Sequence, residues 1–591
     1  MKKSFRGIFL AVLVSCSTII FAGQSAPIYR NMFISYLSPS DVKDIVNYSD
    51  NERLGGYIMW DVRGDVNPTD SGHSLLLALD YPLNHGKWVT SYWTDWSVYG
   101  SASIPYHPYA IPGSYTSAGE KAVNPDLSSK LAHINQLVYS FLEAQTSGDH
   151  LGTLYFNDPW SDLLPTDAFC KNNEICTYQV KPGKSFSDSS KMGNFEAFSQ
   201  LPKQYPQLHT LFSVGGYAHD ATFEAMFNAQ DPDVPMNRFV ASAVSIMNNY
   251  KISGIDLDYE NPSMTLNQSK AYLKLIQLLN SKLQKGQTIH VTMLANQHYL
   301  DGDNGVGFAP GVLKAISSLD KVTAMNLMTY DYHGAFDYAP NSNESRTGFL
   351  TNLTLPNDVP AGYDPEFSIE VSVNALMRQG VDTSKIGVGI PSYGRSLAGI
   401  DEGNQGGLFS TITSNSIVPA GDQDIPGCTT TLPLGSASCS GVFSYQYIVK
   451  NMLHQGFEAM DHASNGQGTT AYAKHWQPVL SKDYKLNITN ESADVGVIVT
   501  VGGFHSDYLS PKANKGYDST SNPSASAIEG GKSLGVSWSS YPGGPKGVCP
   551  NLNFDKDVNI IIDTNDPSGK KGCGSYSMSV PMKHAVGFKR R

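Results

Sequence analysis

The sequence predicts an α/β protein whose main unit is a (β/α)8 TIM barrel, and two observations lead to this prediction. Between residues 87 and 395, short apolar, β-rich runs alternate with longer segments of helical pattern. Strands separated by helices are joined by right-handed crossovers, which make neighbouring strands parallel. Polar residues gather just after several of these runs, and in such barrels the chemistry lies at the carboxyl ends of the strands.

Seven runs are candidate strands, and several of them have the near-continuous apolar character of strands that are buried on both faces. They are 88–93, 136–142, 209–214, 254–260, 289–294, 323–330 and 386–390. The helices expected among them include 236–249, 266–283 and 367–379. A closed barrel needs an eighth strand, which this part of the chain does not supply.

Length and composition limit the classes of protein. A chain of 591 residues exceeds one ordinary domain, so two or three units are expected. Apolar residues make up 40% and charged residues only 16%, which indicates a folded, aromatic-rich protein. The net charge of −11 argues against nucleic acid or an acidic membrane surface as the main partner, because both reward clustered Lys and Arg.

The first 22 residues have the pattern of a secretory signal, with basic residues followed by an apolar run. Cleavage after Ala22 is expected, and the protein is predicted to be secreted or periplasmic. The segment 13–16, LVSC, also resembles a lipoprotein signal that would be anchored at Cys16, but the residues after Cys16 stay apolar. No other run approaches the length of a membrane span.

The other six cysteines fall into three local pairs, and an even number in an exported chain suggests disulfides. The short separations favour the pairs Cys170 with Cys176, Cys428 with Cys439, and Cys549 with Cys573. The sequence alone does not determine this connectivity. None of the spacings resembles a zinc site, so no metal is expected.

The segment 253–260, SGIDLDYE, carries the chemistry of the predicted barrel. In an extended strand, Asp256, Asp258 and Glu260 project to one face, and the apolar side chains between them project to the other. Crowded carboxylates force their pKa values apart, so such a group can supply a general acid and a charged stabiliser. A solvated edge strand or a calcium loop would also contain acids. The apolar opposite face argues against the first, and the missing ligand ladder argues against the second.

Other strand ends carry polar residues that are weak signals one at a time. Gly215 and Gly216 follow the third run, Tyr330 and Asp331 the sixth, and Arg395 the seventh. Their recurrence on successive strands favours one shared site.

The order of these motifs resembles that of the family 18 glycoside hydrolases, the chitinase family, whose fourth strand carries Asp-Gly-x-Asp-x-Asp-x-Glu. Residues 91–96 (SYWTDW), 137–141 (LVYSF) and 389–395 (GIPSYGR) are similar to further family segments. The resemblance covers residues 33–463. It implies hydrolysis of β-1,4 linkages in chitin or chito-oligosaccharides, with no cofactor.

The family's eighth strand has its counterpart at the front of the chain. Residues 54–65, LGGYIMWDVRGD, resemble that strand, and residues 33–47 resemble the end of an α+β subdomain that precedes it in the family. A circular permutation is therefore inferred, because the eighth strand of a closed barrel neighbours the first. The rival interpretation makes residues 27–86 a separate leader and 495–501 the last strand, which lacks a tryptophan.

The resulting division has five parts. They are a signal peptide (1–22), the end of the insertion subdomain (27–50), the catalytic barrel (51–395), the first part of that subdomain (396–480) and a small all-β domain (485–591). In the barrel, the eighth strand is expected at 54–64, the first at 88–93 and a last helix at 74–79. The role of the β domain is left open between carbohydrate binding, surface attachment and simple stabilisation.

By resemblance, the substrate's own N-acetyl group is the nucleophile, and Glu260 protonates the glycosidic oxygen and later activates water. Asp258 would orient the acetamido nitrogen, and Asp256 would share a hydrogen bond with it. The expected substrate-binding residues are Tyr330 at the acetamido carbonyl, Met328 and Asp331 beside it, Trp60 beneath the sugar, and Tyr92, Trp96, Tyr393 and Arg395 along the cleft.

Two departures from the family pattern stand out. Ser253 replaces the first aspartate of the motif, so a shifted pH optimum is expected, and Tyr259 replaces an outer tryptophan or phenylalanine. Two alternatives remain. One is a non-hydrolytic chitin or glycan lectin, which the presence of Glu260 disfavours, and the other is an endo-β-N-acetylglucosaminidase acting on N-glycans.

Overall fold

The computed structural model describes residues 28–69, 72–99, 110–114, 122, 124–158, 162–163, 193–339, 345–356, 359–360, 363, 366–422, 429–432, 440–462, 468–476 and the strands within 486–577. The chain forms two compact units, one of residues 27–480 and one that comprises 1–26 and 481–591. The predicted signal segment and the predicted disulfides lie outside the described residues and side chains.

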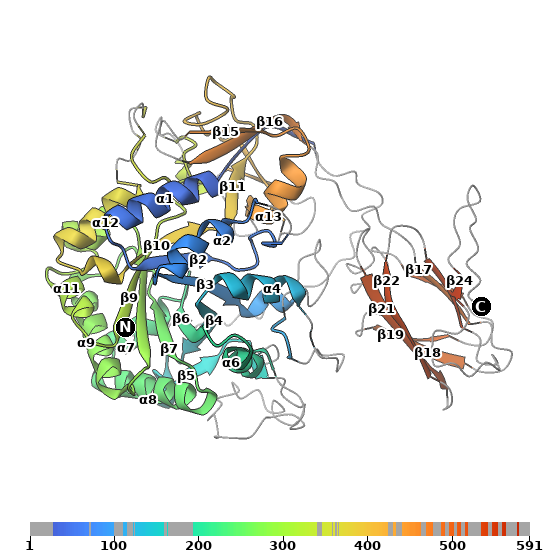
Figure 1. Ribbon diagram of the computed structural model, residues 1–591, viewed down its shortest axis with the longest axis horizontal. Coiled ribbons are helices and arrows are strands. Elements are labelled where there is room, and N and C mark those ends of the chain that lie inside the picture. The colour runs from blue at the N-terminus through green and yellow to red at the C-terminus, as the bar shows by residue number, and fades with distance from the viewer. Residues whose placement is uncertain are drawn as a thin grey trace, which may run out of the picture. The chain divides into compact units, whose positions relative to one another are not determined.

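Eight parallel strands close into a barrel, which confirms the predicted fold class (Figure 1). They are β2 (Gly56–Trp60), β3 (Trp88–Thr94), β4 (Gln136–Ala144), β6 (His209–Gly215), β7 (Gly254–Asp258), β8 (Thr288–Leu294), β9 (Val322–Met328) and β10 (Ile386–Pro391). The order is β3-β2-β10-β9-β8-β7-β6-β4, and pairing of β3 with β4 closes the ring. The short strand β5 (Leu154–Phe156) adds to β4 in antiparallel fashion.

The strand β2, near the start of the chain, lies between β10 and β3. The neighbouring strand β3 packs closely against β2 at Gly56, because a Cβ atom on this residue would lie 2.3 Å from the backbone oxygen of Trp88. The segment 495–501 instead contributes β18 (Gly496–Val501), which pairs with strands of the C-terminal unit. The structure thus gives β2, and not that segment, the place of a barrel strand.

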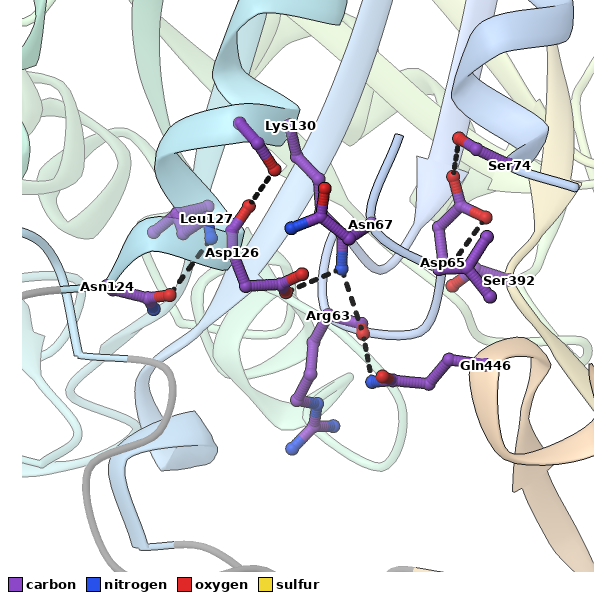
Figure 2. A network of polar contacts seen from close by, with 12 residues as sticks. Arg63, Asp65, Asn67, Ser74, Asn124, Asp126, Leu127, Lys130, Ser392 and Gln446 are labelled. Carbon is purple, nitrogen blue, oxygen red and sulfur yellow. Dashed lines mark hydrogen bonds and ion pairs between the residues drawn. The ribbon is translucent and has the colours of Figure 1, made fainter. Parts of the chain in front are cut away.

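The loop after β2 is fixed by buried polar contacts (Figure 2). The Asp65 carboxylate accepts hydrogen bonds from the Ser74 hydroxyl at 2.7 Å and from two backbone N–H groups at the start of α2 (Leu75–Ala78). The ammonium group of Lys130 is buried and pairs with Asp126 at 2.8 Å, and the amide of Gln446 donates to the backbone oxygen of Arg63. These contacts join the loop to α4 (Pro125–Lys130) and to a distant part of the chain.

Helices cover the outside of the barrel (Figure 1). They include α8 (Asp233–Tyr250), α9 (Leu266–Lys282), α6 (Asn194–Gln204) and α12 (Ile369–Arg378), with the shorter α3 (Asp80–Asn84), α7 (Ala221–Phe227), α10 (Gln297–Asp301) and α11 (Val312–Ser317). Thr265 begins α9 with a capping box to Gln268, and Ser368 caps α12, so side chains satisfy the first free N–H groups.

Two separate clusters of apolar side chains follow from the alternation along the strands. One fills the space between the strands and the outer helices, and Leu257 and Tyr259 belong to it. The other lies inside the barrel and is formed by Ile58, Tyr92, Val138 and Leu211, with Trp60 and Met328 packed on it. The barrel interior is therefore a packed core with the predicted site residues at one end.

A five-stranded antiparallel sheet joins segments from both ends of the first unit. Its order is β14 (Val442–Ser444), β11 (Tyr393–Leu397), β1 (Tyr29–Tyr36), β16 (Thr469–Trp476) and β15 (Glu458–Asp461). The helix α1 (Pro39–Asn51), capped by Ser38, follows β1 and leads to the barrel. A subdomain made of residues near 30 and near 400–476 is thus assembled in space.

The C-terminal unit is all-β. One sheet has the order β20 (Asn514–Tyr517), β17 (Leu486–Asn490), β23 (Val558–Ile562) and β24 (Tyr576–Ser577), and the other β19 (His505–Leu509), β18, β21 (Ser533–Tyr541) and β22 (Lys546–Asn553). Among the helices that the structure describes, none combines the length and apolar character that crossing a membrane would require.

The outer core predicts a stability effect at Trp93, which is fully buried on β3 and packs against the Tyr139 ring at 4.9 Å between centroids. We expect Trp93→Ala to lower the free energy of unfolding of the first unit by about 3–5 kcal/mol, because the ring leaves a cavity. Urea unfolding followed by circular dichroism measures this. Tyr81→Ala, at an exposed ring, is the control, and an equal loss there would contradict the assignment.

Candidate active site

Asp256 is a fully buried carboxyl group on β7 with hydroxyl donors from three other strands. Ser213 on β6 and Tyr92 on β3 donate to its Oδ2 atom at 2.7 and 3.1 Å, and Thr292 on β8 donates to Oδ1 at 2.7 Å. Burial raises the pKa of Asp256, whereas the three hydroxyl donors lower it. Three hydrogen-bond donors stabilise the ionised form of a carboxyl group, so this set of hydroxyls suits a carboxylate that keeps its charge.

Asp258 lies two residues further along β7 and is also buried. Its Oδ1 atom makes no hydrogen bond within the described residues, and the hydrogen bond expected between Asp256 and Asp258 is not among the contacts there. Burial, and then the charges of Glu260 and Asp256, raise the pKa of Asp258 well above its usual range. An unpaired buried carboxyl oxygen is costly unless a ligand group completes it.

Glu260 follows the end of β7, which stops at Asp258 instead of extending through residue 260 as predicted. Burial raises the pKa of Glu260 to about 8, with the carboxylates of Asp220, Asp331 and Asp256 as further causes. A carboxyl group with this pKa is protonated at neutral pH, and it can therefore act as a general acid.

The loop after β6 approaches the acids closely. The backbone N–H of Gly216 donates to the backbone oxygen of Asp258 at 2.9 Å. A Cβ atom on Gly215 would lie 2.1 Å from that oxygen, and the backbone of Gly215 has a φ of +109°, which side chains rarely allow. The two glycines that the sequence places after the third run are thus required by this approach.

Asp331 and Arg395 form a charge pair beside Glu260. The guanidinium group donates two hydrogen bonds to the carboxylate, at 2.6 and 2.8 Å, and the Tyr393 hydroxyl donates a third at 2.7 Å. The Tyr393 ring lies edge-on to Tyr330, with centroids 6.2 Å apart. Burial, and then the charges of Asp258 and Glu260, raise the pKa of Tyr330 well above its usual range, so its hydroxyl stays a hydrogen-bond donor.

An aromatic cluster surrounds Trp60 at the end of β2. The centroid of its ring lies 5.3 Å from that of Tyr92, 5.8 Å from that of Phe141 and 6.4 Å from that of Trp96. Trp96 is 42% exposed, so one face of the cluster is open to a ligand. Flat aromatic faces beside buried acids are suited to hold sugar rings.

The structure brings the predicted residues on or just after β2, β3, β7 and β9 to the carboxyl end of the barrel, together with Tyr393 and Arg395 on β11, the strand that follows β10. Met328 packs on the inner cluster, and Tyr259 lies on the outer face, where its hydroxyl approaches Glu224 at 3.3 Å. Sequence reasoning missed Thr292, Asp220 and the exposed rings of Tyr217 and Phe336. Two of these could have been found, since Tyr217 follows the glycine pair and Phe336 follows Asp331 in the printed sequence.

Ser253 precedes β7, at the end of the strand opposite to Glu260. Its backbone pairs with Thr210 and Thr288, and three residues of strand, about 10 Å, separate it from Asp256. The hydrogen bonds to Asp256 come from other residues. The shifted pH optimum expected from the replaced aspartate stays a prediction.

In the part of the chain that the structure describes, no three His, Cys, Asp or Glu side chains are grouped so as to hold a metal ion. The acids of the site are surrounded instead by hydroxyls, one guanidinium group and aromatic rings. The arrangement can donate a proton from Glu260 and can accept an N–H group at Asp258.

Comparison with known proteins identifies the family. The sequence profile of the Glycosyl hydrolases family 18 matches residues 89–495, and the chain belongs to this family. The predicted family membership is confirmed. The order of strands relative to other members is not tested by this match, so the circular permutation stays a prediction.

Two curated relatives illustrate the similarity. The chain is 23% identical over 466 residues to "Chitinase A" of Pseudoalteromonas piscicida, which covers 72% of this chain and 50% of that protein. It is 25% identical over 312 residues to "Endochitinase 1" of Metarhizium anisopliae, which covers 52% of this chain and 60% of that protein. The chain thus spans between half and three fifths of these relatives. A solved chitinase from Bacillus thuringiensis is 17% identical, covers 79% of this chain and 84% of its own, and has a TM-score of 0.46.

The donors to Asp256 predict a pH-dependent stability effect. Thr292→Val keeps the shape of the side chain and removes one donor to the charged carboxylate, which raises the pKa of Asp256 further above its unfolded value. An acid with a raised folded-state pKa destabilises the fold as pH increases past the unfolded pKa. We expect the variant to lose about 1–3 kcal/mol more stability at pH 8 than at pH 4.5, measured by urea unfolding.

Thr210→Val is the matched control, because the Thr210 hydroxyl is also buried on a barrel strand but makes no hydrogen bond within the described residues. It should change stability little at either pH. An equal loss for Thr292→Val at the two pH values would contradict its role as a donor to a carboxylate.

Proposed function

We propose that the protein is a chitinase that hydrolyses β-1,4 linkages between N-acetylglucosamine units with retention of configuration. The observation that carries this proposal is the pair formed by a protonated Glu260 and a buried Asp258 with an unpaired oxygen. Membership of the family and the names of the curated relatives support it. The proposal includes export, which is predicted from residues 1–22, because the enzyme would meet chitin, an insoluble polymer, outside the cell.

In the first step, Glu260 transfers its proton to the glycosidic oxygen as the bond from that oxygen to the anomeric carbon breaks. The acetamido oxygen of the same sugar forms a bond to the anomeric carbon, which gives an oxazolinium-like intermediate. In the second step, the Glu260 carboxylate takes a proton from water, the water oxygen bonds to the anomeric carbon, and the acetamido oxygen leaves. The acid is restored and one water is consumed.

The residues around Glu260 have matching tasks. The free Oδ1 atom of Asp258 accepts the acetamido N–H, and the negative charge on β7 stabilises the positive intermediate. The Tyr330 hydroxyl, which stays protonated, donates to the acetamido oxygen. Trp60 supplies the floor on which the sugar ring is distorted, and Tyr92 holds Asp256.

Arg395 and Tyr393 hold Asp331 at the edge of the same site, and Trp96 extends the aromatic surface. These residues are proposed to bind further sugar units, and Met328 to close the wall beside Tyr330. The mechanism requires no cofactor.

Glu260→Gln tests the assignment of the acid. We expect hydrolysis of chitohexaose to fall by a factor of about 100 to 10,000, because the amide cannot donate the proton, while binding of the oligosaccharide is retained. Product release measured by chromatography and binding measured by calorimetry separate the two effects. Glu458→Gln, at an exposed position, removes the same charge as a control.

Undiminished hydrolysis in Glu260→Gln would remove Glu260 from the mechanism. A parent protein that binds chitohexaose without releasing products would instead be a lectin. Release of glycans from a high-mannose glycoprotein, without cleavage of chitohexaose, would indicate an endo-β-N-acetylglucosaminidase.

The protonation of Glu260 also predicts a pH profile. The acid is active in its protonated form, so kcat/KM should fall as pH rises through about 8 and should decrease about tenfold per further unit. Initial rates on a fluorogenic chito-oligosaccharide between pH 5 and pH 10 measure this. An alkaline limb near the ordinary pKa of a glutamic acid would contradict the burial of the acid in the free protein.

A further inference from the structure

Glu143, near the carboxyl end of β4, is a carboxylate that the proposed mechanism does not use. The Nδ1 atom of His219 lies 2.9 Å from its Oε1 atom, and the Tyr155 hydroxyl donates a hydrogen bond to its Oε2 atom at 2.7 Å. Tyr155 is the residue opposite Glu143 in the antiparallel pair of β4 and β5. His219 belongs to the loop between β6 and α7. Glu143 therefore joins the hairpin of β4 and β5 to that loop.

A second contact joins the end of β4 to the loop after β6. Phe141 precedes Glu143 by two residues. A Cβ atom on Gly216 would lie 2.8 Å from the Phe141 ring, so the backbone of the loop lies directly against this ring. The Phe141 ring is stacked with the rings of Trp60 and Trp96, whose centroids are 5.8 and 6.1 Å away. The loop after β6 thus packs on the aromatic cluster that is proposed to hold the sugar.

Backbone hydrogen bonds make a compact turn of residues 216–219. The N–H of Gly216 donates to the backbone oxygen of Asp258 at 2.9 Å, and the N–H of His219 donates to the backbone oxygen of Gly216 at 3.0 Å. The backbone oxygen of His219 then accepts the N–H of Thr222, in α7, at 2.9 Å. One end of the turn is therefore bound to the acid strand, and the other end is held by Glu143 through the His219 side chain.

The turn has a conformation that needs support from its surroundings. Ala218 has a φ of +66°, in the left-handed region that residues with a side chain rarely adopt. Such a conformation costs free energy and persists where neighbouring contacts determine it. Gly216 and His219, on either side of Ala218, make these contacts, with Asp258 and Glu143 respectively. Loss of the Glu143 contact would release one side of the turn.

Tyr217 lies in this turn with its ring 84% exposed. It comes two residues after the end of β6, where Gly215 is paired in register with Asp258. Tyr217 therefore stands at the carboxyl end of the barrel, beside the acid strand. An exposed aromatic ring in this place is suited to stack on a sugar ring. The turn sets the position of the ring, because Tyr217 lies between the two residues that anchor it, Gly216 and His219.

We propose that Glu143 is a positioning residue for substrate binding. Through His219 it holds the turn that presents Tyr217 to sugar units beyond the one at Glu260. The proposal rests on the proposed function, because it takes a chito-oligosaccharide to be the ligand of this surface. The Glu143 side chain is only 13% exposed, so its contacts are shielded from water, unlike those of a surface ion pair, which stabilises little. The effect of Glu143 should appear in the binding of long substrates and not in the breaking of the bond.

The kinetics of chitohexaose hydrolysis test this role. We expect Glu143→Ala to raise KM by about five- to tenfold and to leave kcat within about twofold of the parent, because binding is weakened without a change at the acid. Glu143→Gln keeps an acceptor oxygen at the same side-chain length and should keep KM near that of the parent. His219→Ala removes the same contact from the side of the loop and should raise KM as Glu143→Ala does, so the test holds even if Glu143→Ala does not fold.

Two further variants separate positioning from a general loss of stability. Tyr217→Ala should also raise KM, and its combination with Glu143→Ala should raise KM no further, because both substitutions act through the same ring. Asp80→Ala is the matched control, since Asp80 contacts the Nδ1 atom of His133 at 2.7 Å, just before β4 at the amino end of the barrel. This variant breaks a similar contact and should leave KM and kcat unchanged.

An unchanged KM in folded Glu143→Ala and His219→Ala variants would overturn the proposal, as would a fall of kcat alone or independent effects of Glu143→Ala and Tyr217→Ala. Hydrogen exchange of the peptide that contains residues 216–222, measured without substrate, is a second measurement. It should be faster in Glu143→Ala than in the parent and restored in Glu143→Gln. If the parent cleaves no chitohexaose, the proposed function fails, but faster exchange would still support the hold of Glu143 on the turn. Equal exchange in the parent and Glu143→Ala would reject it.

Discussion

The site depends on one buried carboxylate, that of Asp256, and on the hydroxyl groups that hold it. A charge removed from water is stable only where donors replace the lost hydration, and here they come from β3, β6 and β8. These strands are separated in sequence but lie within one closed ring of strands. The donors that stabilise this charge are therefore brought together only when the barrel closes. The charge in turn helps to hold protons on Asp258 and Glu260.

The beginning of the chain contributes to both layers of the first unit. Strand β1 lies between β11 and β16 in the antiparallel sheet, and β2 lies between β10 and β3 in the barrel. Ser392, between β10 and β11, bonds through its backbone N–H to the oxygen of Trp60 and through its hydroxyl to that of Asp61. The backbone of Trp60 and Asp61 is thus bonded to the segment that carries Tyr393 and Arg395.

The loop after β6 also approaches the acids of β7. The residues of this loop that come nearest to the acids are glycines, not acids. Two glycines after β6 allow the backbone to touch the carbonyl of Asp258, and the same loop continues into His219 and Asp220. The short distance is available only because no side chain occupies it.

Most of the barrel could be predicted from the sequence, because strands buried on both faces have continuous apolar runs and the acid triplet alternates with large apolar residues. Most boundaries were accurate to within about two residues. The expected eighth strand at 54–64 was too long, since β2 is Gly56–Trp60, and the helix expected at 236–249 begins three residues earlier, at Asp233. Alternation also placed Asp256 and Asp258 on the inner face and Tyr259 on the outer face. The family motif supplied the proposed roles of these residues.

Local pattern determined which residues form strands and which acids share a face, since both depend on neighbours in the chain. Only the tertiary structure decided what surrounds each acid. Thr292 and Ser213 lie 36 and 43 residues from Asp256 in the sequence, and only folding brings their hydroxyls to its carboxylate. The pKa of a buried carboxyl group is set by distance in space and by lost hydration, and both arise only when the barrel closes.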